Sequence, residues 1–146
     1  MNKISICVVF MLLLILPMYA MAASSDDQNY GNLICSDITS IYDGDTFRCN
    51  IEGVHPLLGN RIGIRVNGVD TPEMKDKRPA IKELAQKAKQ YTVAKLRAGK
   101  VIELRNVTRG KYFRIVADVF IDNQNLANLL IAEGLGKKYD GGKKEW

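Results

Sequence analysis

The chain has 146 residues, of which 47% are hydrophobic and 25% are charged, and its formal net charge at pH 7 is +5. This length leaves room for one compact domain and excludes a second core of similar size. The basic charge favours polyanionic partners such as nucleic acid or anionic lipid. The single histidine, His55, excludes catalysis by a histidine pair, histidine-based metal sites and a Ser-His-Asp triad.

The first 22 residues are typical of a signal peptide for export. Lys3 precedes a predominantly apolar run over Ile4–Leu16, and the small-residue pattern Ala20–Ala22 follows. A membrane anchor is the alternative, but a helix needs about 20 apolar residues to cross a bilayer. We therefore predict cleavage after residue 22 and a soluble periplasmic or extracellular product without stable membrane association. Residues 23–32 are small, polar and acidic, which predicts a flexible leader.

The segments after the leader show the periodicities of strands and helices. The extended segments are rich in β-branched and aromatic residues, and the third alternates apolar and polar residues with a period of two. The longer helical segment carries apolar residues at spacings of three and four, and Gly99 closes it. In chain order we predict strands Ile34–Tyr42, Thr46–Ile51 and Ile62–Val69, helix Ala80–Ala98, strands Val101–Val107 and Arg114–Ile121, and helix Leu126–Glu133.

This order of elements predicts an α+β fold that is mainly β. Five short strands, with one helix after the third and a short helix at the C-terminal end, are typical of a five-stranded OB-fold barrel. We place this domain at residues 33–139 and a flexible tail at residues 140–146, because the tail is rich in Gly and Lys. OB barrels commonly bind oligonucleotides and oligosaccharides, but a fold alone does not give a function.

The two cysteines outside the predicted signal, Cys35 and Cys49, flank the first predicted hairpin. An exported protein reaches a compartment that tolerates a disulfide. Two extended residues this far apart need not lie opposite one another, and a disulfide requires close α-carbons. The sequence leaves both a disulfide and two buried thiols open.

Three polar clusters stand at the ends of predicted strands. They are Asp43–Thr46 at the first turn, Arg65 with Val69–Glu73 after the third strand, and Lys111–Arg114 before the fifth. Each cluster alone is a weak signal, but the ordered set is specific. From about Ile34 to about Tyr139 the chain resembles the staphylococcal nuclease family, which implies an OB-fold nuclease acting on DNA and RNA.

Cleavage of a phosphodiester concentrates negative charge on oxygen atoms, so a catalyst needs cations fixed in advance. Asp45 and Asp70 supply carboxylate oxygens that gather such a cation, and the resemblance implies that the backbone carbonyl of Thr71 adds a further ligand. An oxygen-rich site of this kind suits Ca²⁺. The alternative interpretations are that Asp45 only forms a turn and that Asp70 only caps the turn that follows it.

Three further residues are candidates for the catalytic step. Glu73 lies three residues beyond the second aspartate, where it would orient or deprotonate the attacking water, although it could also be a solvated loop residue. Arg65 faces away from its apolar neighbours and is suited to a bidentate contact with phosphate. The resemblance implies that Arg114 joins it in stabilising charge near the leaving 5′ oxygen. The alternative for the arginines is a structural ion pair, with Glu103 or Asp118 as the partner.

The resemblance also implies substrate-binding residues. Lys111, Tyr112 and, placed only approximately, Tyr139 would contact a terminal phosphate or stack on a base. The chain departs from the family pattern at two places. Phe113 stands where the family usually has glycine, and the loop Gly53–Asn60 looks longer and more apolar.

Together these features predict an exported, monomeric, calcium-dependent endonuclease. It would hydrolyse DNA and RNA, single-stranded or locally unpaired, at the 5′ P–O bond to leave 3′-phosphates. The alternative is a non-catalytic OB-fold module that binds single-stranded nucleic acid. A binding module has no reason to keep Asp45, Asp70 and Glu73 beside a phosphate site, because their charge repels the ligand unless a metal ion neutralises it.

Overall fold

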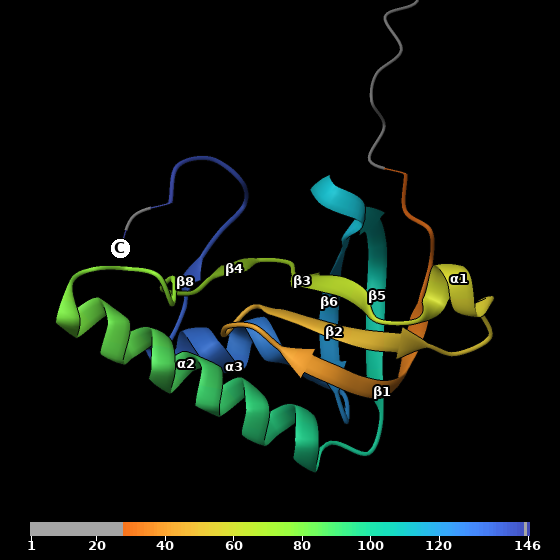
Figure 1. The fold of residues 1–146 in the computed structure, drawn as a ribbon, viewed down its shortest axis with the longest axis horizontal. Coiled ribbons are helices and arrows are strands. Elements are labelled where there is room, and N and C mark those ends of the chain that lie inside the picture. The colour runs from red at the N-terminus through yellow and green to blue at the C-terminus, as the bar shows by residue number, and fades with distance from the viewer. Residues whose placement is uncertain (1–27, 145) are drawn as a thin grey trace, which may run out of the picture.

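The structure is a computed structural model that describes residues 28–144 and 146. The predicted signal peptide, residues 1–22, and residues 23–27 of the predicted leader lie outside the described residues. Figure 1 shows the strands gathered into a barrel, with the two longer helices packed along one side. In chain order the elements are β1 (Leu33–Ile41), β2 (Thr46–Ile51), α1 (Pro56–Gly59), β3 (Ile62–Val66), β4 (Val69–Asp70), α2 (Pro79–Ala98), β5 (Ile102–Arg109), the 3-10 helix η1 (Lys111–Phe113), β6 (Ile115–Ile121), β7 (Gln124–Asn125), α3 (Leu126–Ala132) and β8 (Lys137–Lys138).

Five strands close into a barrel in the order β3-β2-β1-β5-β6. Neighbouring strands in this order are antiparallel, and the barrel closes where β3 and β6 pair in parallel, with Ile64 opposite Ile115 and Arg65 opposite Val116. Closure leaves no open edge in the sheet and encloses one face of every strand. The prediction of a five-stranded OB-type barrel is confirmed.

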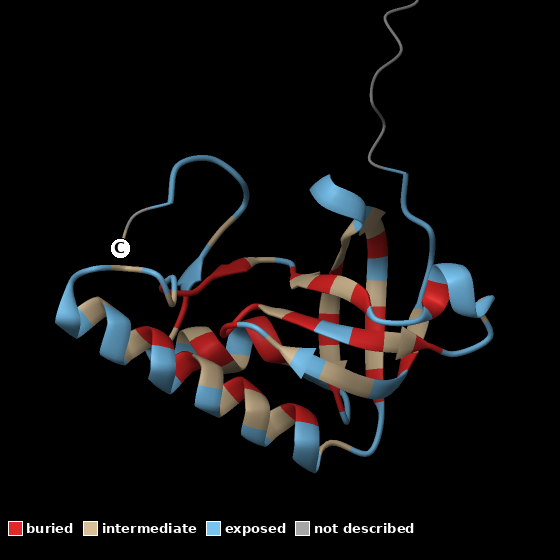
Figure 2. Ribbon diagram, in the orientation of Figure 1, coloured by how far each residue is buried: buried red, intermediate tan, exposed pale blue. Residues whose placement is uncertain are grey.

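Alternation along the strands fills the barrel with apolar side chains (Figure 2). Phe47, Ile64, Leu104 and Val119 are fully buried there, and each such side chain stabilises the fold by about 1.5–3 kcal/mol. Helix α2 presents a narrow face of small residues, including Ala85 and Ala88, to the barrel. No helix among the described residues is long and apolar enough to span a membrane.

The structure differs from the predicted elements in the region before α2. The predicted third strand, Ile62–Val69, is interrupted after Val66, because Gly68 takes a left-handed backbone conformation with φ of +79°. The chain then continues as β4, which pairs with β8 instead of the barrel. The short helix α1 was not predicted, since four residues are too few to show helical periodicity.

Both ends of the predicted domain extend further than the sequence indicated. Within the predicted leader, the Tyr30 amide donates to the carbonyl of Val107 at 2.7 Å, and the Val107 amide donates to Gly31 at 3.1 Å. These residues therefore continue the pairing of β1 with β5 on the N-terminal side of Leu33. At the other end, Lys144 and Trp146 of the predicted flexible tail contact Asp70, as described below.

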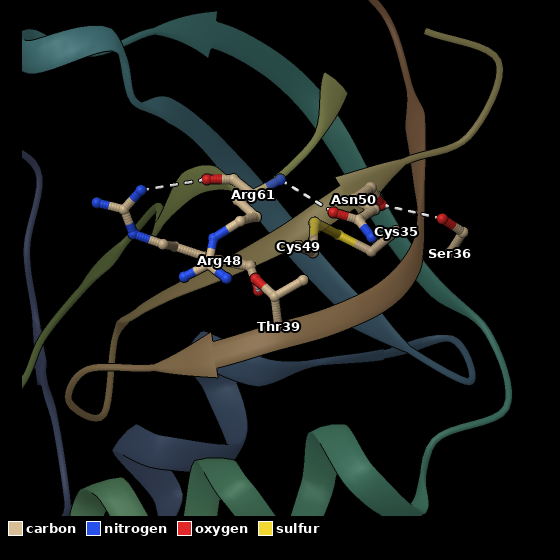
Figure 3. Close-up of a disulfide and its surroundings, with 7 residues drawn as sticks. All are labelled: Cys35, Ser36, Thr39, Arg48, Cys49, Asn50 and Arg61. Carbon is tan, nitrogen blue, oxygen red and sulfur yellow. Dashed lines mark hydrogen bonds between the residues drawn. A yellow bond between two sulfur atoms is a disulfide. The ribbon is translucent and has the colours of Figure 1, made fainter. Parts of the chain in front are cut away.

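Cys35 and Cys49 form a disulfide across the first hairpin (Figure 3). Cys35 is paired with Ile51 in the register of β1 and β2, so the two cysteines are diagonal neighbours on one face. A shift of register between Cys35 and Asp37 accompanies this pairing, and the α-carbons of the cysteines lie 5.7 Å apart. The disulfide closes the loop that carries the Asp43–Thr46 turn.

Loss of this disulfide should lower the stability of the fold. The sequence separation of the cysteines is 14, and a loop of this length corresponds to about 3 kcal/mol of unfolding free energy. We expect the Cys35→Ala/Cys49→Ala variant to lose about that amount in urea denaturation followed by circular dichroism. Reductant should destabilise the wild type and leave the double variant unchanged. Equal urea midpoints for both proteins without reductant would contradict the expectation.

Candidate active site

The acidic turn between β1 and β2 is held against α2. The Thr92 hydroxyl donates to the carbonyl of Gly44 at 2.7 Å, in a fully buried contact. A Cβ atom at Gly44 would lie 2.8 Å from Thr71 and 2.9 Å from Ala88, so this close approach requires glycine. The sequence analysis assigned no role to Thr92, which lies within the predicted helix Ala80–Ala98. A threonine on a face of otherwise apolar residues was the signal that could have identified this contact.

Asp45, Arg65 and Asp70 meet at the end of the barrel beside this turn. Asp45 and Asp70 are only 1% and 3% exposed. Arg65 forms ion pairs with both, through Nη1 to Asp45 Oδ1 and through Nη2 to Asp70 Oδ1, the latter at 3.0 Å. Buried carboxylates are stable only when their charge is compensated, and one guanidinium compensates both here.

The remaining oxygen of Asp45 is also fixed. The backbone amide and the hydroxyl of Thr71 donate to Asp45 Oδ2 at 2.8 and 3.0 Å, and Thr46 donates to Asp45 Oδ1 at 2.9 Å. These bonds join the start of β2 to the residue that follows β4. Asp45 is therefore more than a turn former, because its side chain connects three segments of the chain.

The alternative partners considered for Arg65 are engaged elsewhere. Glu103 pairs with Arg105 at 2.6 Å, and Asp118 accepts hydrogen bonds from two asparagine side chains. The ion pairs that Arg65 does make, with Asp45 and Asp70, place it at the acidic cluster. Its side chain is 15% exposed, so part of the guanidinium faces solvent.

The C-terminal segment turns back over these carboxylates, and the chain end marked C in Figure 1 lies near the start of α2. Lys144 Nζ lies 2.9 Å from Asp70 Oδ1 and 2.9 Å from Glu73 Oε1. The indole nitrogen of Trp146 donates to Asp70 Oδ2 at 2.8 Å, and Lys137 lies over the Trp146 ring. No local sequence pattern indicates these contacts, because pairing between the tail and the loop before α2 depends on the fold.

Two buried acids of the cluster have pKa values that are shifted in opposite directions. Burial raises the pKa of Asp43 to about 6, against the opposing charge of Arg65. Burial would also raise the pKa of Asp70, but hydrogen bonds from Lys144 and Trp146 outweigh it and hold that pKa below 3.8. The sequence analysis treated Asp43 only as part of the turn. Its carboxylate accepts the Asp45 amide at 3.1 Å and shapes the loop from within.

Arg114 lies on the same face of the barrel as Arg65. Its stem passes over Gly63, where an added Cβ would meet Arg114 Cγ at 3.0 Å. Gly63 and Arg65 are two residues apart in β3 and so project to one face. Arg114 also lines a cleft of about 320 Å³ together with Thr46, whose hydroxyl donates to Asp45. The two guanidiniums therefore border one region of the surface.

The predicted substrate-binding residues lie further out. Lys111 and Tyr112 belong to the exposed η1, and the Tyr112 side chain is 89% exposed. Tyr139 follows β8, and its hydroxyl donates to the carbonyl of Gly142 at 3.0 Å. Within the described part of the chain, no hydrogen bond or ion pair connects these three residues to the carboxylates. These three residues can therefore be connected to the carboxylates only by a ligand that contacts both.

The acidic cluster fits the chemistry of a calcium site. No three His, Cys, Asp or Glu side chains gather as a metal site within residues 28–144 and 146. The predicted set contains only two carboxylates and one backbone carbonyl, with the other positions left to water and substrate. Asp45 and Asp70 lie close enough for one guanidinium to contact both, so an ion held by their oxygens would replace contacts of Arg65.

Comparison with known proteins identifies the family of the chain. The sequence pattern of the family described as staphylococcal nuclease homologue matches residues 63–145, more than half of the chain. The matched part includes Arg65, Asp70, Glu73 and Arg114, whereas Asp45 lies before it. A search of curated proteins found no match. The matched sequence and the barrel show that the chain belongs to the staphylococcal nuclease family. The fold of this family is a nuclease-like fold that binds nucleic acid.

Proposed function

We propose that the protein is an exported, calcium-dependent endonuclease that hydrolyses DNA and RNA at the 5′ P–O bond and leaves 3′-phosphates. The observation that carries the proposal is the meeting of Asp45, Asp70 and Arg65 at one end of a barrel of the nuclease family. Acids that gather a cation and a guanidinium that faces the phosphate are the groups this reaction requires.

Asp45, Asp70 and the backbone carbonyl of Thr71 would hold the calcium ion. When bound, calcium supplies Lewis-acid polarisation of the phosphate oxygens. The hydrogen bonds from Thr46 and Thr71 support this assignment, because they fix the Asp45 carboxylate before a ligand arrives. A ligand oxygen that is already positioned needs little reorganisation on binding.

The charged residues around the cluster take the other roles. Arg65 and Arg114 grip the phosphate from one face and stabilise the negative charge that grows on its oxygens, with Arg114 nearer the leaving 5′ oxygen. Glu73, whose side chain is 51% exposed, orients or deprotonates the attacking water. Lys111 and Tyr112 contact the nucleic-acid strand where it leaves the barrel.

The alternative is an OB-fold module that binds single strands without cutting them. The balance of charge favours the enzyme, because Asp45, Asp70 and Glu73 carry three negative charges, whereas Arg65 and Lys144, which pair with them, carry two positive ones. Export rests on the pattern of residues 1–22, and we propose a monomer that acts on single-stranded or locally unpaired substrates.

Incubation of the protein with denatured DNA tests the proposal. We expect cleavage in calcium and none with a chelator, and we expect products that polymerase can extend only after phosphatase removes a 3′-phosphate. Products that carry a free 3′-hydroxyl would contradict cleavage at the 5′ P–O bond. Binding without cleavage under every divalent metal tried would favour the non-catalytic module.

The Arg65→Lys variant should lose most of its activity and keep its fold. An ammonium preserves the charge beside Asp45 and Asp70 but cannot reproduce a two-pronged phosphate contact. We expect turnover to fall by at least about 100-fold, as for removal of one stabilising donor. The circular dichroism spectrum should stay native, although the thermal midpoint should fall, because an ammonium cannot contact both buried acids as the guanidinium does. Arg105→Lys is the matched control, because Arg105 pairs with Glu103 away from the cluster. Near-normal turnover in Arg65→Lys would remove this residue from the mechanism.

Calcium binding should displace the C-terminal segment. Lys144 and Trp146 contact both oxygens of Asp70, which the ion needs. Trp146 is the only tryptophan, so its emission should shift during a calcium titration. Because exposed ion pairs contribute up to about 1 kcal/mol, Lys144→Met should tighten calcium binding by about twofold to fivefold.

Lys143→Met serves as the control for this titration, since it removes an equal charge from the neighbouring position. Its calcium affinity should stay near that of the wild type. Calorimetric binding of calcium without any change in Trp146 emission would show that the segment stays in place.

A further inference from the structure

Two departures from the family pattern meet at a hollow that the proposed function does not use. Phe113 replaces the usual glycine in η1, and Leu58 belongs to the apolar loop that forms α1. Both line a hollow of about 250 Å³, and Tyr30, from the segment before β1, lines it as well. In Figure 1 this segment passes between α1 and the raised η1, beside the end of β5.

The walls of the hollow are apolar and exposed. Phe113 is 73% exposed, Leu58 is 56% exposed and Tyr30 is 53% exposed. Large apolar side chains that gather at a surface and remain in water mark a site that a ligand covers. Ile62 and Val107, which are buried, form its floor.

The backbone at Phe113 supports the same interpretation. Tyr112 and Phe113 have φ values of +57° and +61°, in the left-handed region that favours glycine. A bulky residue held in this region costs free energy, and such residues are concentrated at ligand-binding sites. This chain holds an aromatic ring in a conformation that glycine would adopt more easily, and the ring faces the hollow.

Charge connects the hollow to the candidate active site. Arg114 lines both the hollow and the cleft of about 320 Å³ beside Thr46, and Arg109 also borders the hollow. When a phosphate of a nucleic-acid strand contacts Arg114, the adjoining nucleotide is therefore within reach of the aromatic walls. Aromatic faces next to guanidiniums are the features that proteins use to bind single-stranded nucleic acid, since a base stacks while its phosphate is neutralised.

We propose that this hollow is a subsite for one nucleobase of the substrate strand, next to the phosphate that Arg114 contacts. The proposal rests on the proposed function for its substrate. It assigns Phe113, Leu58 and Tyr30 to substrate binding, beyond the residues that the family resemblance implies. Stacking does not read the edge of a base, so the subsite accepts any base and favours unpaired strands.

Binding of a fluorescently labelled thymidine octanucleotide, followed by anisotropy in a chelator so that no strand is cut, tests the subsite. Leu58→Ser and Phe113→Ala should each weaken binding at least about fivefold, which is the lower end of the contribution of one stacked base. Leu57→Ser is the matched control. Leu57 is 83% exposed on the same α1 but does not line the hollow, so its affinity should stay within about twofold of the wild type.

A second arm moves one abasic position along the octanucleotide. At one position the missing base should lower the affinity of the wild type and have little effect on Leu58→Ser, because the two changes remove the same contact. Equal affinities of Leu57→Ser and Leu58→Ser, with thermal midpoints like that of the wild type, would overturn the subsite. Abasic effects that are the same in the wild type and in Leu58→Ser would overturn it as well.

These outcomes separate the subsite from the proposed function. A protein that shows the binding pattern but cuts no strand in calcium retains the subsite and loses the nuclease assignment. A protein that cuts DNA in calcium but lacks the pattern loses the subsite alone. Absence of any binding to the octanucleotide would also overturn the subsite, because the hollow would then have to serve a different class of ligand.

Discussion

The acidic end of the barrel depends on the ion pairs of one guanidinium. Asp45 lies in the turn before β2 and Asp70 lies in β4. Both are almost fully buried and would repel each other if they met alone. Arg65 compensates both charges, and breaking such a buried arrangement costs several kcal/mol. Arg65 lies in β3, Asp70 lies in β4 and Asp45 directly precedes β2. The balance of their charges therefore holds these three strands in position relative to one another. A phosphate or a cation that enters the site therefore competes with contacts that already exist.

Two further constraints keep the acidic turn in place. On one side, the Thr92 hydroxyl and the close packing of Gly44 fix the turn to α2. On the other, the disulfide between Cys35 and Cys49 closes the hairpin that carries it. Groups that must face growing charge act best when they are positioned before the reaction begins. The contacts that hold the turn therefore position the acidic side chains of the site and also stabilise the fold.

The surroundings of the site contain contacts that the sequence pattern did not predict. The C-terminal segment brings Lys144 and Trp146 onto Asp70, and Phe113 turns an aromatic ring toward a hollow beyond Arg114. Arg114 borders both the cleft near the acids and this hollow, so one side chain connects the surroundings of the acidic cluster to the hollow. The family resemblance concerns the acidic cluster, whereas the structure alone shows these flanking contacts.

The sequence by itself determined the barrel and the identity of the charged cluster. Strand alternation and helix periodicity are local, and the ordered set of Asp45, Arg65 and Asp70 is visible without coordinates. Only the tertiary structure decided that Arg65 pairs with these two acids instead of Glu103 or Asp118, and that Cys35 and Cys49 form a disulfide. It also decided that Trp146 reaches Asp70, a contact between residues 76 positions apart. Local sequence patterns show which side chains can take part in the site. Which residues they contact across the chain depends on how the strands close into a barrel and on the free-energy cost of leaving a buried charge unpaired.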